Sequence, residues 1–172
     1  MSALPPNQIL ISNGGDQWVE EYNLDTGEIS PFAAACNGTA GTSHTGHRIN
    51  DVSLSTPMGV LYDGEQKVYL SIHLTRTILS IDTTTDQSSV IITTSKPPRL
   101  LGYGLNSDIV HVTLNNSFAA IKDGLIEYII GTPEGSPGKR TGDISTTRML
   151  NPRAFVEVDN GVWVVADSSN DR

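Results

Sequence analysis

Hydrophobic and polar residues alternate along most of this chain, in short runs that polar turns separate. Alternation with a period of two places successive side chains on opposite faces, as in a β-strand. One stretch reads PRAFVEVD, then Asn160-Gly161, then VWVVAD, and Asn-Gly between two apolar runs is a strong hairpin signal. No window combines a helical period with a cap and a stop. The pattern therefore predicts an all-β protein.

The runs recur in a constant order, which indicates an internal repeat. Each unit has a proline, an alternating strand, a turn and a second strand rich in β-branched residues. A short polar turn then leads to a third strand and a fourth. Units begin at Pro57, Pro98 and Pro152. Four short antiparallel strands per unit are the construction of a β-propeller blade.

The predicted blades cover residues 7–35, 46–94, 97–131 and 142–172 of a single propeller domain. A β-sandwich is the main alternative, but it gives no reason for the recurring proline and hairpin. We expect the first unit to lack its first strand, because Ile9 follows Pro6 too closely, and the last unit to stop after its second strand. The chain is therefore expected to be an incomplete propeller or a fragment. Missing blades or self-assembly would then be needed to close the ring.

The last unit resembles the NHL repeat. It has the Gly142-Asp143 opening, Pro152, and the VADxxNxR ending that includes Asp167, Asn170 and Arg172. The unit at 46–81 resembles it more loosely and keeps Gly46, Leu54, Pro57 and Arg76. The resemblance implies a propeller fold and no particular activity. These motif residues are expected to be structural: Asp167 and Asn170 would bind the backbone of a tight turn, and Arg172 would pair with Asp167.

Composition excludes some classes of partner. The net charge of -8 with only 11 Lys and Arg argues against nucleic acid, since phosphate binding needs clustered cations. No stretch is apolar enough to span a bilayer, so we expect no membrane insertion. Cys36 is the only cysteine, which rules out an internal disulfide. Asn37 and Asn115 each begin an N-glycosylation pattern and favour an extracellular, secreted protein.

The turns after second strands share one face with the connections between blades, and we expect ligands to bind on that face. Its small polar loops suit recognition on a rigid scaffold. The leading hypothesis is a noncatalytic platform that binds a protein or a glycan. The candidate ligand-binding residues are Asn13, Asp16, Trp18, His73, Asn115, Asp167 and Asn170.

Two alternatives stay open. Some propellers related to the NHL type are enzymes, such as calcium-dependent lactonases and the peptide-amidating lyase, and calcium would be expected only in that case. The carboxylates near innermost strands are Asp63, Asp108, Glu157 and Asp159. They form no recognisable catalytic set, so no catalytic residue, metal or cofactor is predicted. His44 and His47 would need a further ligand to bind zinc.

A lectin is the second alternative, with aromatic rings that stack on sugars. The candidate rings are Trp18, Tyr69 and Trp163. Trp18 follows a Gly-Gly turn and is expected to be exposed. Trp163 lies mid-strand among valines, so we expect it to pack between neighbouring blades instead.

Overall fold

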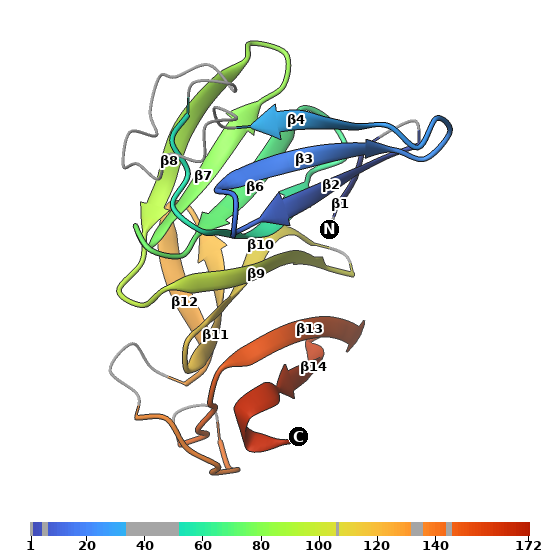
Figure 1. Ribbon diagram of the computed structural model, residues 1–172. Helices are drawn as coiled ribbons and strands as arrows, with labels where there is room; N and C mark the ends of the chain where they lie inside the picture. Colours follow the sequence, from blue (N-terminus) through green and yellow to red (C-terminus); the bar gives the residue numbers. More distant parts are fainter. Residues whose placement is uncertain (1, 5–6, 34–51, 106, 132–135, 144–145) are drawn as a thin grey trace. The chain divides into compact units, whose positions relative to one another are not determined.

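The computed structural model describes residues 2–4, 7–33, 52–105, 107–131, 136–143 and 146–172 (Figure 1). The chain divides into two compact units, Met1–Thr93 and Thr94–Arg172. Every hydrogen-bonded strand pair is antiparallel, and the strands of each sheet follow one another in sequence order. No helix among the described residues is long and apolar enough to cross a membrane.

The first unit has two four-stranded sheets. The first sheet consists of β1 (Ser2–Leu4), β2 (Gln8–Asn13), β3 (Trp18–Asn23) and β4 (Ile29–Ala33). The second consists of β5 (Pro57–Tyr62), β6 (Lys67–Ile72), β7 (Thr77–Asp82) and β8 (Gln87–Thr93). Alternate residues of these strands, such as Leu10, Val19, Val68 and Leu70, form one buried core. The period of two in the sequence thus becomes a shared apolar layer.

Strand β1 corrects the expectation that the first unit lacks its first strand. Ser2 pairs with Leu10 and Leu4 pairs with Gln8. The strand is only three residues long, and Asn7 just before β2 has a φ of 62°. A left-handed residue allows a chain to reverse direction over few residues. A strand therefore fits before β2, although Ile9 follows Pro6 closely.

The second unit has one four-stranded sheet and one hairpin. The sheet consists of β9 (Pro98–Gly104), β10 (Ser107–Leu114), β11 (Ser117–Lys122) and β12 (Leu125–Ile130). The hairpin consists of β13 (Pro152–Asp159) and β14 (Val162–Asp167), followed by the short 3-10 turn Ser168–Asn170. Four valines on one face of the hairpin, Val156, Val158, Val162 and Val164, are each more than half exposed. The expectation that missing blades or self-assembly close the ring stays a prediction.

The repeat expected from the three prolines is present in the strand register. Pro57 lies opposite Ile72, Pro98 opposite Leu114, and Pro152 opposite Asp167. Each partner is the last residue of a second strand. Because the same register opens each of these sheets, they are equivalent blades of four antiparallel strands. The described residues 146–172 hold the first two strands of the last blade. The all-β propeller construction is therefore confirmed and the sandwich alternative is wrong.

The turns from second to third strands also repeat. Gln17 and Arg76 come directly before third strands and have φ values of 66° and 58°. Asp171 has a φ of 54°, and the next residue, Arg172, accepts a backbone hydrogen bond from Asp167 at 2.7 Å. Arg172 thus stands where a third strand would begin. The turn at Asn115 is shorter and lacks this left-handed residue.

Candidate functional site

The NHL-like motif residues of the last unit form one hydrogen-bonded cluster. The Asp167 carboxylate accepts hydrogen bonds from the Leu150 amide at 2.7 Å, Asn170 Nδ2 at 2.6 Å and Arg172 Nε at 3.2 Å. Asn170 also donates to the Gly138 carbonyl at 2.7 Å. Asp167 is 3% exposed and Asn170 7%. The cluster therefore ties the turn after β14 to the connection that precedes β13.

The opening of the motif makes a turn of its own. The Asp143 carboxylate accepts hydrogen bonds from the amide and hydroxyl of Thr146, at 3.0 and 2.9 Å. Gly142 has a φ of 154°, and a Cβ there would press on the Thr146 hydroxyl. This position therefore needs glycine, which explains the Gly-Asp pair at the start of the repeat.

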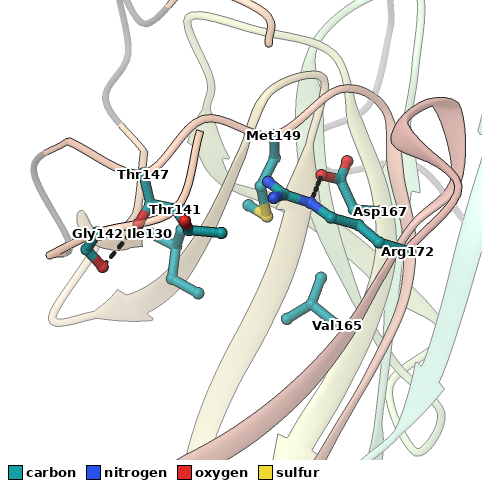
Figure 2. Close-up of a pocket in the computed structure, with 8 residues that line it drawn as sticks. All are labelled: Ile130, Thr141, Gly142, Thr147, Met149, Val165, Asp167 and Arg172. Carbon is teal, nitrogen blue, oxygen red and sulfur yellow. Dashed lines mark hydrogen bonds and ion pairs between the residues drawn. The ribbon is translucent and has the colours of Figure 1, made fainter. Parts of the chain in front are cut away.

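A hollow of about 300 Å³ lies beside this cluster (Figure 2). Its lining residues are Ile130, Thr141, Gly142, Thr147, Met149, Val165, Asp167 and Arg172. Figure 2 shows Asp167 and Arg172 paired with each other on one side of it, and Thr147 turned to Gly142 on the other. Its two charged groups are already paired with each other and much of the wall is apolar, so this hollow offers little to hold a polar ligand.

A second pocket, of about 270 Å³, is polar. Its lining residues are Arg99, Asn115, Asn116, Leu150, Asn151 and Ser169. They come from the start of β9, the β10–β11 turn, the connection before β13 and the turn after β14. The β10–β11 turn and that connection belong to the face on which the sequence predicts ligand binding. We refer to this cavity as the polar pocket.

The walls of the polar pocket are joined by hydrogen bonds. Arg99 Nη2 donates to Asn115 Oδ1 at 3.4 Å. The Asn115 carbonyl accepts from the Asn151 amide at 2.7 Å, and Asn151 Nδ2 donates to Ser169 Oγ at 3.4 Å. The short backbone bond fixes the frame of the pocket, whereas the two side-chain bonds are long and weak.

The electrostatics of the polar pocket are set by Arg99. Burial, and to a lesser degree repulsion from Arg153, lower the pKa of the Arg99 guanidinium below its ordinary value. Arginine nevertheless stays charged at neutral pH. None of the described residues that line the pocket is acidic. The pocket is therefore a locally positive, donor-rich place on an acidic protein.

In the first unit, Asn13 and Asp16 form a local turn. Asn13 Nδ2 donates to Asp16 Oδ2 at 2.8 Å, and the Asp16 amide donates to Asn13 Oδ1 at 3.1 Å. Asn13 ends β2 as Asp167 ends β14, and both pair with a residue three positions later. The acid and the amide have exchanged places between the two turns. This equivalence is invisible in a comparison of residue identities.

The other two candidates of the first unit lie against the protein interior. Trp18 is partly buried and packs on the core of this unit, so the expectation that it is exposed is wrong. From its position at the start of β3 the indole packs against the core, as Tyr62 also does. The His73 amide donates to the Thr56 carbonyl at 3.0 Å. His73 thereby joins the β6–β7 turn to the connection before β5.

Three of the four carboxylates that the enzyme alternative would use bind backbone amides. Asp63 Oδ1 accepts three amide hydrogen bonds, from residues 65, 66 and 67, at 2.8 to 2.9 Å. The Glu157 carboxylate accepts from the amides of Leu105 and Gly161, each at 2.7 Å. Asp159 accepts from the Asn160 amide at 2.8 Å. The side chain of Asp108 lies outside the described residues.

Trp163 belongs to a cluster of four aromatic rings between β9–β12 and β13–β14. Its ring centroid lies 4.4 Å from that of His111, 4.9 Å from Phe118 and 5.8 Å from Phe155. The expected packing between blades is thus confirmed, and stacking of Trp163 on a sugar is disfavoured. Burial lowers the pKa of His111 despite its hydrogen bond to the backbone of Ile109 and the nearby charge of Glu157.

Several sequence predictions fall on residues that the structure does not describe. These are the glycosylation candidate Asn37 and the histidines His44 and His47. Among the described parts of the chain, no group of three or more His, Cys, Asp or Glu side chains could hold a metal ion. Sequence analysis did not single out Arg99, Asn151 or Ser169, although the last two lie in loops of the face on which it predicts ligand binding. They are far apart in the sequence, and no local pattern singles them out.

Comparisons with known proteins agree with the blade construction. No family model and no curated protein matches the chain. An auxiliary nutrient-binding protein from Bacteroides thetaiotaomicron has a similar structure, with a TM-score of 0.63 and 15% identity over 98% of this chain and 44% of that one. The fold is that of a β-propeller.

Two further solved structures support this fold. A nidogen–laminin complex matches with a TM-score of 0.57 and 12% identity, over 87% of this chain and 48% of the other. A Bacteroides thetaiotaomicron protein of unknown function matches with a TM-score of 0.54 and 15% identity, over 96% and 51%. The chain thus spans about half the length of these structures. At such identities the likeness concerns the propeller fold alone.

Proposed function

We propose that this protein is a noncatalytic binding protein, an NHL-type propeller that recognises a glycan with the polar pocket on its loop face. The observation that carries the proposal is the convergence of Arg99, Asn115, Asn151 and Ser169 from four separate segments into one polar cavity. A concave site with a few converging polar groups is the usual form of a small-ligand site.

Size and chemistry favour a sugar over a protein surface. The cavity of about 270 Å³ is slightly smaller than the usual ligand pocket of about 300–1,000 Å³, and suits a single sugar unit. Amide and hydroxyl groups on its walls match the hydroxyl groups of a sugar. Protein interfaces depend instead on buried aromatic anchors, and four rings of the second unit, those of His111, Phe118, Phe155 and Trp163, are engaged with one another.

The remaining partner expectations fit this proposal. One similar solved structure is of a nutrient-binding protein and another is of a nidogen–laminin complex. The glycosylation patterns at Asn37 and Asn115 favour an extracellular location, where glycans are accessible. The three carboxylates that bind backbone amides leave little support for the enzyme alternative.

A glycan panel with a pocket-filling variant tests the proposal. Ser169 is exposed and lines the pocket, so Ser169→Trp should fill the cavity and abolish binding of any glycan that the unmodified protein retains. Glu127→Trp places the same ring on an exposed position that does not line the pocket, and it should bind normally. Equal glycan binding by both variants would contradict the proposed site. If the protein binds protein ligands and no glycan, a protein-binding platform would be favoured instead.

A further inference from the structure

The charge of the polar pocket differs from that of the protein as a whole. The chain has a net charge of -8, yet among the described residues that line the pocket the one charged side chain is the guanidinium of Arg99. Arg153 lies close enough to repel it. A cationic pocket in an acidic chain concentrates anions and repels cations at its mouth.

Hydrogen bonds at the pocket have room to change partners. The bonds from Arg99 Nη2 to Asn115 Oδ1 and from Asn151 Nδ2 to Ser169 Oγ both measure 3.4 Å, beyond the usual range of about 2.7–3.2 Å. An oxygen of a ligand could accept shorter bonds from the same donors. The exchange would cost little, because each bond that it replaces is weak.

Arginine is well suited to hold an oxyanion here. Its planar guanidinium presents paired N–H groups that match the two oxygens of a carboxylate, or two of the three terminal oxygens of a sulfate. Arg99 is half-buried beside the pocket. Charge interactions strengthen where water is partly excluded.

We infer that the polar pocket binds an acidic sugar, with Arg99 as the counter-charge for a carboxylate or sulfate group. Asn115, Asn151 and Ser169 would then bind the hydroxyl groups of the same sugar. The inference rests on the proposed glycan-binding function and names the chemical class of its ligand.

Calorimetric titration with matched sugars tests the inference. The probes are trigalacturonate, the same trisaccharide with all carboxyl groups methyl-esterified, and galactose 6-sulfate, which carries a sulfate and no carboxylate. Esterification removes the charge and leaves the sugar ring and its hydroxyl groups. We expect at least one acidic probe to bind about tenfold or more tightly than the ester, because a hydrogen bond between charged groups is much stronger than a neutral one. Which acidic probe binds distinguishes carboxylate from sulfate.

Variants of Arg99 provide a second test of the inference. Arg99→Gln should lose about tenfold or more of the affinity for the acidic probe, and Arg99→Lys should recover only part of it, since lysine lacks the planar fork. Arg140→Gln is the matched control, because Arg140 is exposed and does not line the pocket. Thermal unfolding confirms that each variant is folded. If Arg99→Gln does not fold, Ser169→Trp replaces it and should abolish acidic-probe binding.

The outcomes separate the two proposals. Equal binding of acid and ester, with loss of both in Ser169→Trp, overturns the acidic-sugar inference and leaves glycan binding standing. Acidic-probe binding that Arg99→Gln and Ser169→Trp both leave unchanged also overturns the inference. If neither these probes nor any glycan of the panel binds, the proposed function fails as well.

Discussion

Thr56 and Asn151 hold the same position in two different sheets. Each precedes the proline that opens a first strand, and their φ values are 59° and 62°. The Thr56 amide donates to Gln17 Oε1 at 2.6 Å, whereas the Asn151 amide donates to the Asn115 carbonyl at 2.7 Å. In both cases the turn of the preceding sheet holds the residue before proline. This contact joins consecutive blades at their loop face.

Thr56 is a poor residue for this backbone. A β-branched side chain at positive φ is strained, whereas asparagine tolerates the left-handed region. Thr56→Asn should therefore raise the free energy of unfolding by about 0.5–1 kcal/mol, measured by urea denaturation. The same exchange at exposed Thr93, which has no positive φ, should give no gain. A stability loss at position 56 would count against the left-handed backbone there.

Glycines in β9 allow the hairpin β13–β14 to approach closely. A Cβ on Gly102 would lie 3.0 Å from two ring atoms of Phe155, and one on Gly104 would collide with Glu157 Oε2. Gly102→Ala should cost about 1–3 kcal/mol by overpacking. Gly138→Ala is the control, since its nearest neighbour is Arg148 Cβ at an ordinary 3.5 Å. Equal effects in a chemical denaturation series would show that the sheets do not pack this closely.

Asp167 should be the most sensitive residue of the NHL-like cluster. Asp167→Ala leaves the Leu150 amide and the Asn170 amide group without their acceptor, and each buried donor so left costs about 1–3 kcal/mol. We expect a total loss of about 2–6 kcal/mol, with a smaller loss for Asp167→Asn, which keeps the shape. Glu127→Ala, on an exposed strand position, should be near neutral. Similar midpoints of urea unfolding for the two alanine variants would refute the structural role.

His111 should make the stability depend on pH. Its folded pKa lies below the ordinary 6.5 because the ring is buried, so the unfolded chain takes up a proton first as the pH falls. The stability from neutral His111 is complete above about 6.5 and declines below it, down to the folded pKa, by at most about 1.4 kcal/mol per pH unit.

The comparison variant is His111→Phe, which keeps an aromatic ring beside Phe118 and Trp163. Unfolding free energies at about pH 7.5 and about pH 5 should differ more for the unmodified protein than for the variant. Parallel pH dependences would show that His111 is not buried in its neutral form. The titration of carboxylates, which both proteins share, cancels when the two pH dependences are compared.

A glycan on Asn115 would compete with the proposed ligand. The Asn115 side chain lines the polar pocket and accepts from Arg99. If secretory expression modifies Asn115, the modified protein should not bind the pocket's sugar. Ser117→Ala removes the acceptor pattern at a residue only 1% exposed and should restore binding. Mass spectrometry of the Asn115 peptide and titration of the same sample provide the measurement, and full binding by modified protein would place the ligand elsewhere.

Local rules determine much of the fold. The alternation of apolar and polar residues predicted the strands, and the predicted runs 152–159 and 162–167 coincide with β13 and β14. The Asn160-Gly161 turn and the two-residue period of a strand both act within a few residues. The prolines marked the first strands for the same reason, since proline cannot donate to a ladder and tends to stand where a strand begins. The sequence alone therefore determined the fold class and the repeat.

Only the tertiary structure decided which side chains meet. Sequence reasoning left Trp18 exposed, but the core of the first unit covers part of it, because burial depends on the neighbouring sheet as well as on the strand. It named Asn115 as a candidate but could not place it beside Arg99 and Ser169, which join it only when consecutive blades pack. Contacts between segments so distant depend on the register and packing of whole sheets, and no local pattern in the chain records them.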